Sequence, residues 1–244
     1  MSSTNYQELT TKDEIQRVAA ETDGAWKDPS IPRQQFAIVR DELRRFTEGQ
    51  TVPPFNALRR CITMLPAHAR TPDVRLLDVG AASGYYWNIL RLSGFDGRYT
   101  AVDYSPEFKP IAIELNPEID YHVGDARALP FKDDEFDIVL SGANILHIRD
   151  YGKAVSEVAR VAKSFAIFHK TPILLDDPTK YFRKEAYGVP CLEIHFNETE
   201  LLRLFRQNGL EFRYAVDVFI DEDRRAGHRS YVLSKSNELA YHPV

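Results

Sequence analysis

The stretch Leu77-Asp78-Val79-Gly80-Ala81-Ala82-Ser83-Gly84 decides how the rest of the chain is interpreted. Apolar residues lead into it from Val74 and small residues follow, which is typical of a β-strand that ends in a tight turn. Small residues let the backbone approach a ligand, and a helix predicted to begin near Tyr85 would offer free N–H groups. The turn favours a ligand-binding loop, although a tight turn without a ligand has the same pattern.

NAD-dependent enzymes also use a glycine-rich turn after a strand, so the turn alone does not identify the ligand. Their fingerprint is Gly-x-Gly-x-x-Gly, and this sequence has Ala82 where the second glycine belongs. The spacing therefore disfavours pyrophosphate binding and leaves an NAD-linked oxidoreductase as the weaker alternative.

Downstream of the turn, short apolar runs alternate with helical patterns, which indicates βαβ units around a parallel sheet. The runs are nearly continuous, as in strands that are covered on both faces. About seven strands are predicted, at residues 74–79, 99–102, 119–123, 136–140, 165–168, 212–220 and 230–234. Asn197 and Glu200 resemble a capping box at the start of a helix that Gly209 would close. We expect an α/β, Rossmann-like, mostly parallel sheet with helices on both faces and an antiparallel last strand.

Residues 1–70 have helical periodicity instead. Apolar side chains fall on one helical face at Phe36, Val39, Leu43 and Phe46. We expect residues 1–70 to form an N-terminal helical cap or lid and residues 71–244 to form the core. The connection from 174 to 195 is longer than a usual strand-to-helix link, so it is expected either to shape a pocket as part of the lid or to be a surface excursion.

The composition limits the possible partners. A chain of 244 residues suits one α/β core with a helical addition. A net charge of −5 without a long basic patch makes nucleic acid an unexpected partner. No apolar run is long enough for membrane insertion and the N-terminal region is polar, so we expect a cytoplasmic protein. Cys61 and Cys191 lack metal-ligand spacing, and we expect reduced packing residues and no metal site.

Three successive predicted strands end in acidic residues. Asp103, at the tip of the second strand beside the small-residue turn, is placed to accept hydrogen bonds from ribose hydroxyls. Asp125, at the end of the third, could accept from an adenine amino group while a neighbouring N–H reaches a ring nitrogen. Each acid alone is also consistent with a solvated surface position. Together with Asp78 they predict a nucleoside site.

These residues, followed by Leu129-Pro130-Phe131 and Phe136-Asp137-Ile138-Val139, resemble the class I S-adenosylmethionine (SAM)-dependent methyltransferases. The resemblance is closest to the small-molecule branch that includes the ubiquinone and menaquinone methyltransferases. It covers about residues 74–170, and residues 194–235 fit that family's final helix and strand pair. Residues 1–70 match only as a variable cap.

The resemblance implies SAM as the cofactor. It assigns these cofactor-binding residues: Asp78, Gly80, Ala81, Ala82, Gly84, Asp103, Tyr104, Asp125, Ala126, Ser141 and Gly142. The small-residue loop would pass the methionine part, with Asp78 orienting it. Asp103 would hold the ribose, and Asp125 with Ala126 would read the adenine.

Two further implications concern the rest of the site. Leu129 and Phe131 would form an apolar wall near the adenine ring, and Ser141 and Gly142 would offer backbone carbonyls to the methionine ammonium. Many relatives have glycine at the position of Ala82, and this departure puts the path of the loop in doubt more than the cofactor.

Methyl transfer from a sulfonium is an in-line displacement, so the protein mainly aligns the acceptor and excludes water. A base is needed only where the acceptor atom still carries a proton. The candidate catalytic residues are His147, which Asp150 could orient, and His169 at the same edge of the sheet. For each histidine, packing or a backbone hydrogen bond is the structural alternative.

The predicted function is methyl transfer from SAM to a small molecule. Nucleic-acid methylation is disfavoured because Ser141-Gly142-Ala143-Asn144 stands where an Asn/Asp-Pro-Pro-Tyr-type segment would follow the fourth strand. A catalytically silent SAM-binding or scaffold protein stays open as an alternative, since binding residues do not establish catalysis. The sequence leaves the substrate, the acceptor atom and the oligomeric state undetermined.

Overall fold

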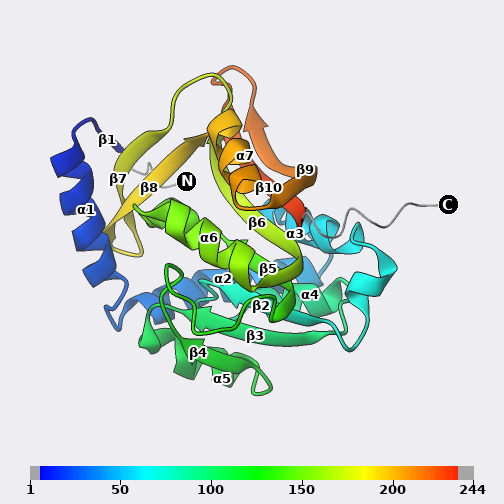
Figure 1. Ribbon diagram of the computed structural model, residues 1–244. Helices are drawn as coiled ribbons and strands as arrows, with labels where there is room; N and C mark the ends of the chain where they lie inside the picture. The colour runs from blue at the N-terminus through cyan, green and yellow to red at the C-terminus, as the bar shows by residue number, and fades with distance from the viewer. Residues whose placement is uncertain (1–5, 236–244) are drawn as a thin grey trace.

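Ten β-strands form one sheet in the part of the chain that the computed structural model describes, residues 6–235 (Figure 1). The ends of the predicted cap and core, residues 1–5 and 236–244, lie outside the described residues. The strand order is β1-β7-β8-β6-β5-β2-β3-β4, and β9 joins through β10, which pairs with β6. The strands are β1 (Gln7–Leu9), β2 (Arg75–Val79), β3 (Arg98–Asp103), β4 (Asp120–Val123), β5 (Phe136–Gly142), β6 (Ala162–Leu174), β7 (Lys180–Ala186), β8 (Val189–Asn197), β9 (Leu210–Asp221) and β10 (Ala226–Lys235).

Helices cover both faces of this sheet (Figure 1). The α-helices of the described residues are α1 (Lys12–Ala25), α2 (Ile31–Thr47), α3 (Pro53–Thr63), α4 (Tyr86–Leu92), α5 (Lys109–Leu115), α6 (Tyr151–Val161) and α7 (Glu198–Gln207). Short 3-10 helices are η1 (Ala67–Arg70), η2 (Pro106–Phe108) and η3 (Ile145–His147). None of the helices between residues 6 and 235 is long and apolar enough to cross a membrane.

The central strands β8, β6, β5, β2, β3 and β4 run parallel to one another. Leu76 and Leu77 of β2 show why these strands are so apolar. Both side chains are fully buried, and the two belong to different hydrophobic clusters. Successive side chains of a strand point to opposite faces, so the clusters lie on the two sides of the sheet. This double burial confirms the predicted Rossmann-like α/β class.

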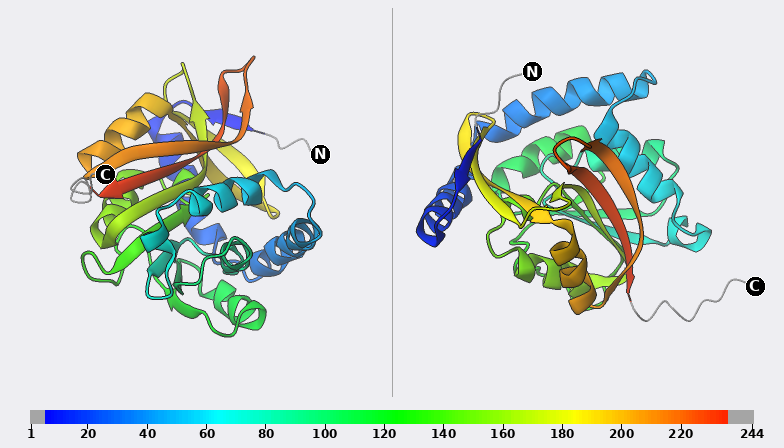
Figure 2. Two further views of the ribbon diagram at one scale, coloured as in Figure 1. Left: turned by 90° about the vertical axis from the view of Figure 1, so that its right-hand side faces the viewer. Right: turned by 90° about the horizontal axis from the view of Figure 1, so that it is seen from above.

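The C-terminal strands run against this parallel core. β10 pairs antiparallel with both β6 and β9, and the two long strands lie side by side at the end of the chain (Figure 2). The antiparallel last strand is therefore confirmed. Tyr214 of β9 donates a hydrogen bond of 2.8 Å to the carbonyl of Cys61, which attaches α3 to this strand pair.

The connection from 174 to 195, expected either to shape a pocket or to be a surface excursion, contains a β-hairpin. β7 and β8 pair antiparallel and are joined by Tyr187 and Gly188, whose φ angles of 53° and 78° give the left-handed turn that hairpins favour. β8 then pairs with the end of β6, and β1 adds to β7, so the sheet of the described residues has ten strands rather than about seven. Pro190 and Glu193 interrupted the apolar pattern of β8 in the sequence.

The N-terminal helices pack directly on the strands of the core. α1 lies against β8, where the backbone N–H of Leu192 donates to the Thr22 hydroxyl at 2.7 Å. In Figure 1, α1 and β1 lie together with the β7–β8 hairpin at one end of the sheet. The predicted cap therefore contributes to the same edge of the sheet as the hairpin.

Candidate active site

A cavity of about 250 Å³ lies at the edge where β2, β3 and β5 end, and β6 contributes Lys170 to its lining. The carboxyl ends of parallel strands meet at one edge, which is where open α/β sheets bind ligands. The lining also includes Asp23 of α1, Gln35 of α2 and Tyr187 of the hairpin turn, with Trp26 immediately after α1. Segments far apart in the sequence therefore enclose one space.

The small-residue loop after β2 reaches this cavity only in part. Gly80 and Ala82 line it, whereas Ala81 and Gly84 do not. Gly80 has φ 75°, and a Cβ built on it would lie 2.6 Å from Cγ of Asn144, so this position requires glycine. Ala82 has φ 49°, an unfavourable left-handed conformation for a residue with a Cβ.

Asp103 lines the cavity at the end of β3 and holds the loop in place. Its carboxylate accepts a 2.8 Å bond from the backbone N–H of Ala82 and a 2.9 Å bond from that of Ser105. Burial raises the pKa of Asp103 to about 6, and the backbone donors only partly oppose it. Tyr104 lies next to it in the lining.

Asp78 points into the core and is not part of the lining. Its Oδ2 accepts a short hydrogen bond from the Tyr99 hydroxyl of β3, so this carboxylate connects two strands instead of orienting the loop. Oδ1 is buried without a hydrogen-bond partner among residues 6–235. Burial raises the pKa of Asp78 to about 7.

Asp125, Ala126 and Arg127 all line the cavity, and the carboxylate of Asp125 already has a partner. Arg127 Nη2 donates to it at 2.8 Å and reaches Asp23 of α1 with Nη1 at 3.4 Å. Burial favours a higher pKa for Asp125, but the hydrogen bonds and charge of Arg127 outweigh burial and lower the pKa. The sequence predicted Asp125 as a binding residue but did not indicate that Arg127 pairs with it.

The end of β5 and the residues after it bring the backbone of Gly142 and the side-chain amide of Asn144 to the cavity. Gly142 lines it, and a Cβ at Gly142 would lie 2.2 Å from the Tyr86 ring. Ser141 is buried outside the lining, and its hydroxyl has no partner within the described residues. Asn144 lines the cavity with a buried Nδ2 that likewise has none, which makes it a free donor that sequence analysis missed.

His147 lies at the cavity, at the end of η3. Its Nδ1 is 2.6 Å from the carbonyl oxygen of Leu192 in β8, and its ring is 5.2 Å from that of Trp26. Burial lowers the pKa of His147 to about 4, so the ring is neutral at neutral pH. Asp150 pairs with Arg149 at 3.6 Å, and the Leu192 carbonyl takes the orienting role that was predicted for Asp150.

His169 is fully buried in β6 and is not part of the lining. Its Nδ1 lies 2.9 Å from the Ser230 hydroxyl, and its ring packs on Tyr86 at 5.4 Å. Burial lowers the pKa of His169 to about 3. The structure therefore brings one of the two predicted histidines to the cavity and places the other behind its wall.

Residues 77–168 match the family model described as a methyltransferase domain. The chain is 33% identical over 133 residues to a demethylmenaquinone methyltransferase of Renibacterium salmoninarum, covering 54% of this chain and 55% of that one. A second, of Chlorobaculum parvum, is 31% identical over 92 residues, which is 37% of each chain. The 1,6-didemethyltoxoflavin-N1-methyltransferase structure of Burkholderia thailandensis aligns with a TM-score of 0.59 and 18% identity, covering 97% of both chains. Residues 77–168 form a methyltransferase domain, and the chain has the Rossmann-like methyltransferase fold.

These alignments cover about half or less of the two curated relatives. The cofactor of the methyltransferase domain is SAM. Two features of the cavity fit an adenosyl amino acid: a carboxylate at Asp103 with lone pairs left for hydroxyl donors, and the unpartnered amide of Asn144. The absence of a Cβ at Gly80 lets the Asn144 side chain pack closely against the backbone of the loop.

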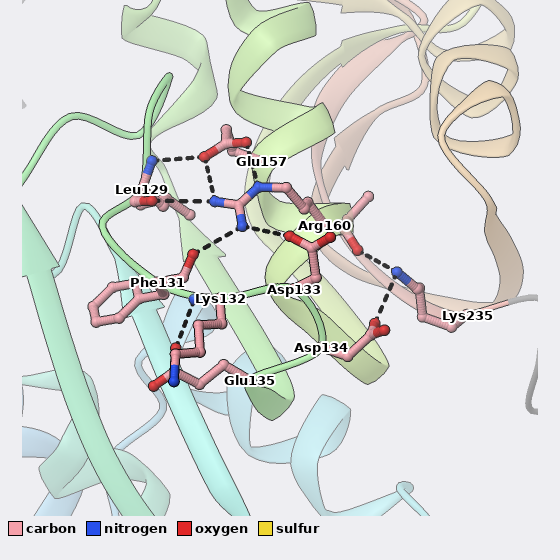
Figure 3. A network of polar contacts seen from close by, with 10 residues as sticks. Leu129, Phe131, Lys132, Asp133, Asp134, Glu135, Glu157, Arg160 and Lys235 are labelled. Carbon is pink, nitrogen blue, oxygen red and sulfur yellow. Dashed lines mark hydrogen bonds and ion pairs between the residues drawn. The ribbon is translucent and has the colours of Figure 1, made fainter.

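Leu129 and Phe131 of the methyltransferase domain do not line the cavity, although they were predicted to wall the adenine. Figure 3 shows what holds them: Arg160 of α6 donates to the carbonyls of Leu129 at 3.1 Å and Phe131 at 2.8 Å. The same guanidinium binds Glu157 and Asp133. Leu146 and Ile148 supply apolar lining instead.

Other lining residues lie outside residues 77–168, and Lys170, Glu193 and His228 among them were not assigned to the site from the sequence. Lys170 of β6 and His228 of β10 reach the cavity from antiparallel strands that pair with each other. Lys184 and Glu193 come from the β7–β8 hairpin and form an ion pair. One feature of the sequence could have pointed to Lys170 as a site residue: it directly follows His169 at the end of a predicted strand. Residues 6–235 contain no group of His, Cys, Asp and Glu suited to hold a metal ion.

Proposed function

We propose that the protein transfers the methyl group of SAM to a small planar molecule bound in the same cavity. The observation that carries this proposal is the position of Asp103, a carboxylate in the cavity wall bonded to the loop after β2. The aromatic rings of Trp26, His147 and Tyr187 support a planar acceptor. Relatives named for demethylmenaquinone and 1,6-didemethyltoxoflavin methylation support a small-molecule acceptor.

The cofactor would lie between the strand ends. Asp103 would accept from the ribose hydroxyls, because each carboxylate oxygen retains a lone pair after its backbone bond. Gly80, Ala82 and Asn144 would lie along the methionine part. Asp125 would contribute to adenine binding through the lone pairs that Arg127 leaves free.

When bound, SAM supplies a methyl carbon that the sulfonium already activates. The protein then has to align the acceptor and exclude water. A carbonyl oxygen only accepts hydrogen bonds, so Nδ1 of His147 must carry the proton and donate to Leu192. This tautomer leaves the lone pair on Nε2, which would take the proton from the acceptor atom as the new bond forms.

The test combines binding with transfer. Calorimetry with SAM, its demethylated product S-adenosylhomocysteine and NAD should show binding of the first two only. Labelled methyl from SAM should enter the small-molecule fraction of a cell extract. Binding without incorporation into that fraction would overturn the proposal in favour of a silent SAM-binding protein.

A matched pair of variants tests the ribose contact. Asp103→Asn should weaken SAM binding about tenfold to a hundredfold, because hydrogen bonds to a charged group contribute about 1.5–3 kcal/mol. Asp96→Asn, on the exposed turn before the same strand, should bind as the parent chain does. Thermal melting checks that Asp103→Asn is folded, and equal affinity in the two variants would remove the ribose assignment.

A further inference from the structure

One cation in the cavity wall has no ion-pair partner within residues 6–235. Lys170 lines the cavity from β6, whereas the other two cations of the lining are neutralised. Arg127 is paired with Asp125, and Lys184 with Glu193. Burying an ammonium without a partner is costly. An anionic group of a bound ligand would therefore neutralise the Lys170 ammonium.

The backbone at Lys170 is itself in an unfavourable conformation. Its φ is 54°, at a point where the pairing of β10 with β6 shifts register, and its N–H donates to the Ser230 hydroxyl at 3.3 Å. Among residues 6–235, six non-glycine residues have positive φ, and four of them line this cavity: Ala82, Ala143, Lys170 and Tyr187. Such conformations cluster at functional sites, so the irregularity at Lys170 indicates a functional position.

No carboxylate within residues 6–235 forms an ion pair with Lys170, although the negative charges of Glu42 and Glu193 act on it. Glu193 is held by Lys184, by His195 at 3.0 Å and by the Tyr6 hydroxyl at 2.9 Å. Glu42 of α2 is not part of the lining. His228 lies on β10 opposite Pro172, and its buried Nδ1 has no partner within the described residues. A lysine and an unpartnered histidine nitrogen therefore line the same part of the sheet edge.

Aromatic rings also line this cavity. The Trp26 ring lies 5.2 Å from His147 and 6.2 Å from Tyr187. Tyr85 also lines the cavity and stands 4.4 Å from the ring of Tyr86. Aromatic side chains pack favourably against a flat ring, so this lining suits a planar molecule.

We propose that the methyl acceptor is an acidic aromatic molecule whose anionic oxygen is bound by the Lys170 ammonium, with Nδ1–H of His228 as a second donor. Its ring lies among Trp26, His147 and Tyr187. The proposal rests on the methyl transfer proposed above and names its substrate class. A neutral acceptor would leave both Lys170 and the sulfonium of the cofactor uncompensated, whereas an anion offsets this positive charge.

The experiment measures binding of matched acids and amides to the full chain saturated with S-adenosylhomocysteine. The probes are benzoate against benzamide and 2-naphthoate against 2-naphthamide, titrated by calorimetry. The acid of at least one pair should bind about tenfold or more tightly than its amide. Lys170→Met should remove that preference by weakening the acid alone, and Lys170→Arg should retain it.

Lys163→Met is the matched control, because Lys163 lies on the same strand with an exposed side chain and pairs with Asp137 at 3.6 Å outside the cavity. It should bind all four probes as the parent chain does. His228→Phe should weaken acid binding without changing amide binding, which keeps the test valid if Lys170→Met fails to fold in a melting experiment.

The outcomes separate the two proposals. Failure to bind S-adenosylhomocysteine would contradict the proposed methyl transfer. Normal cofactor binding with no preference for the acid, with no probe bound, or with the preference intact in both Lys170→Met and His228→Phe would overturn the acidic-acceptor inference.

Discussion

At the scale of single residues, His147 shows how a contact distant in the sequence selects one tautomer of a ring. The Leu192 carbonyl, 45 residues away, lies 2.6 Å from Nδ1 and holds the proton there. Burial lowers the pKa of His147 to about 4, so the ring stays neutral down to mildly acidic pH. A neutral ring with its lone pair on Nε2 is the form that a general base needs.

Replacing His147 by Phe should lower turnover by a factor of about 10² to 10⁴, the usual contribution of a general base. The aromatic contact with Trp26 is retained, so the affinity for SAM should stay nearly unchanged. Steady-state kinetics with calorimetry make the comparison, and His122→Phe on the edge strand β4 is the control. Unchanged turnover would restrict His147 to packing.

At the scale of elements, the end of β5 fits against α4 without space for a side chain. Gly142→Ala would bring a Cβ to 2.2 Å from the Tyr86 ring. We expect the free energy of unfolding to fall by about 1–3 kcal/mol, the usual cost of overpacking. Urea denaturation measures it.

Gly152 near the start of α6 is the matched control for Gly142. A Cβ at Gly152 meets nothing within 4 Å, and the residue is helical. Gly152→Ala should raise the free energy of unfolding by about 0.5–1 kcal/mol, because alanine loses less conformational entropy in a helix. The same direction of change in both variants would contradict the close packing at β5.

Arg160 attaches the segment between β4 and β5 to α6 (Figure 3). Arg160→Met keeps much of the apolar stem and removes the bonds to two carbonyls and two carboxylates. Since the side chain is 30% exposed, we expect a loss of only about 1–2 kcal/mol in unfolding free energy. Amide hydrogen exchange at residues 129–135 should accelerate. Arg149→Met, with one weak ion pair, is the control, and equal exchange in both variants would contradict the anchoring role.

At the scale of the whole molecule, buried titratable groups act on stability in opposite directions. Burial lowers the pKa of His147 and His228 to about 4, from 6.5. Their contribution to stability is therefore lost as the pH falls from about 6.5 towards 4. Burial raises the pKa of Asp78 to about 7, from 3.8, so its contribution is lost as the pH rises through that range.

Asp78→Asn tests the loss of stability that ionisation of Asp78 should cause as the pH rises. Asparagine can still accept from Tyr99 but cannot ionise, so the melting temperature of the variant relative to the parent should rise between about pH 4 and pH 7. Calorimetric melting across this range tests it, with Asp96→Asn as the exposed control. A difference that does not change with pH would show that Asp78 does not titrate in this window.

Local signals predicted the parts of the fold that depend on neighbours in sequence. The capping residue Asn197 accepts from the N–H of Glu200 at 3.0 Å, as its spacing indicates, and Gly209 follows α7 with φ 75°. The hairpin of residues 180–197 escaped prediction because its strands carry charges and a proline, and burial under α1 and against β6 stabilises them.

The amino-acid sequence alone determined the α/β class, the parallel core and the acidic strand end at Asp103, because continuous apolar runs and small-residue turns encode these locally. Only the tertiary structure decided which side chains share the cavity. Lys170, Asn144 and His228 lie on strands and turns whose pairing joins distant parts of the chain, and strand register determines whether a side chain faces the core or a ligand. For that reason Lys170 reaches the cavity and His169, its neighbour on β6, does not.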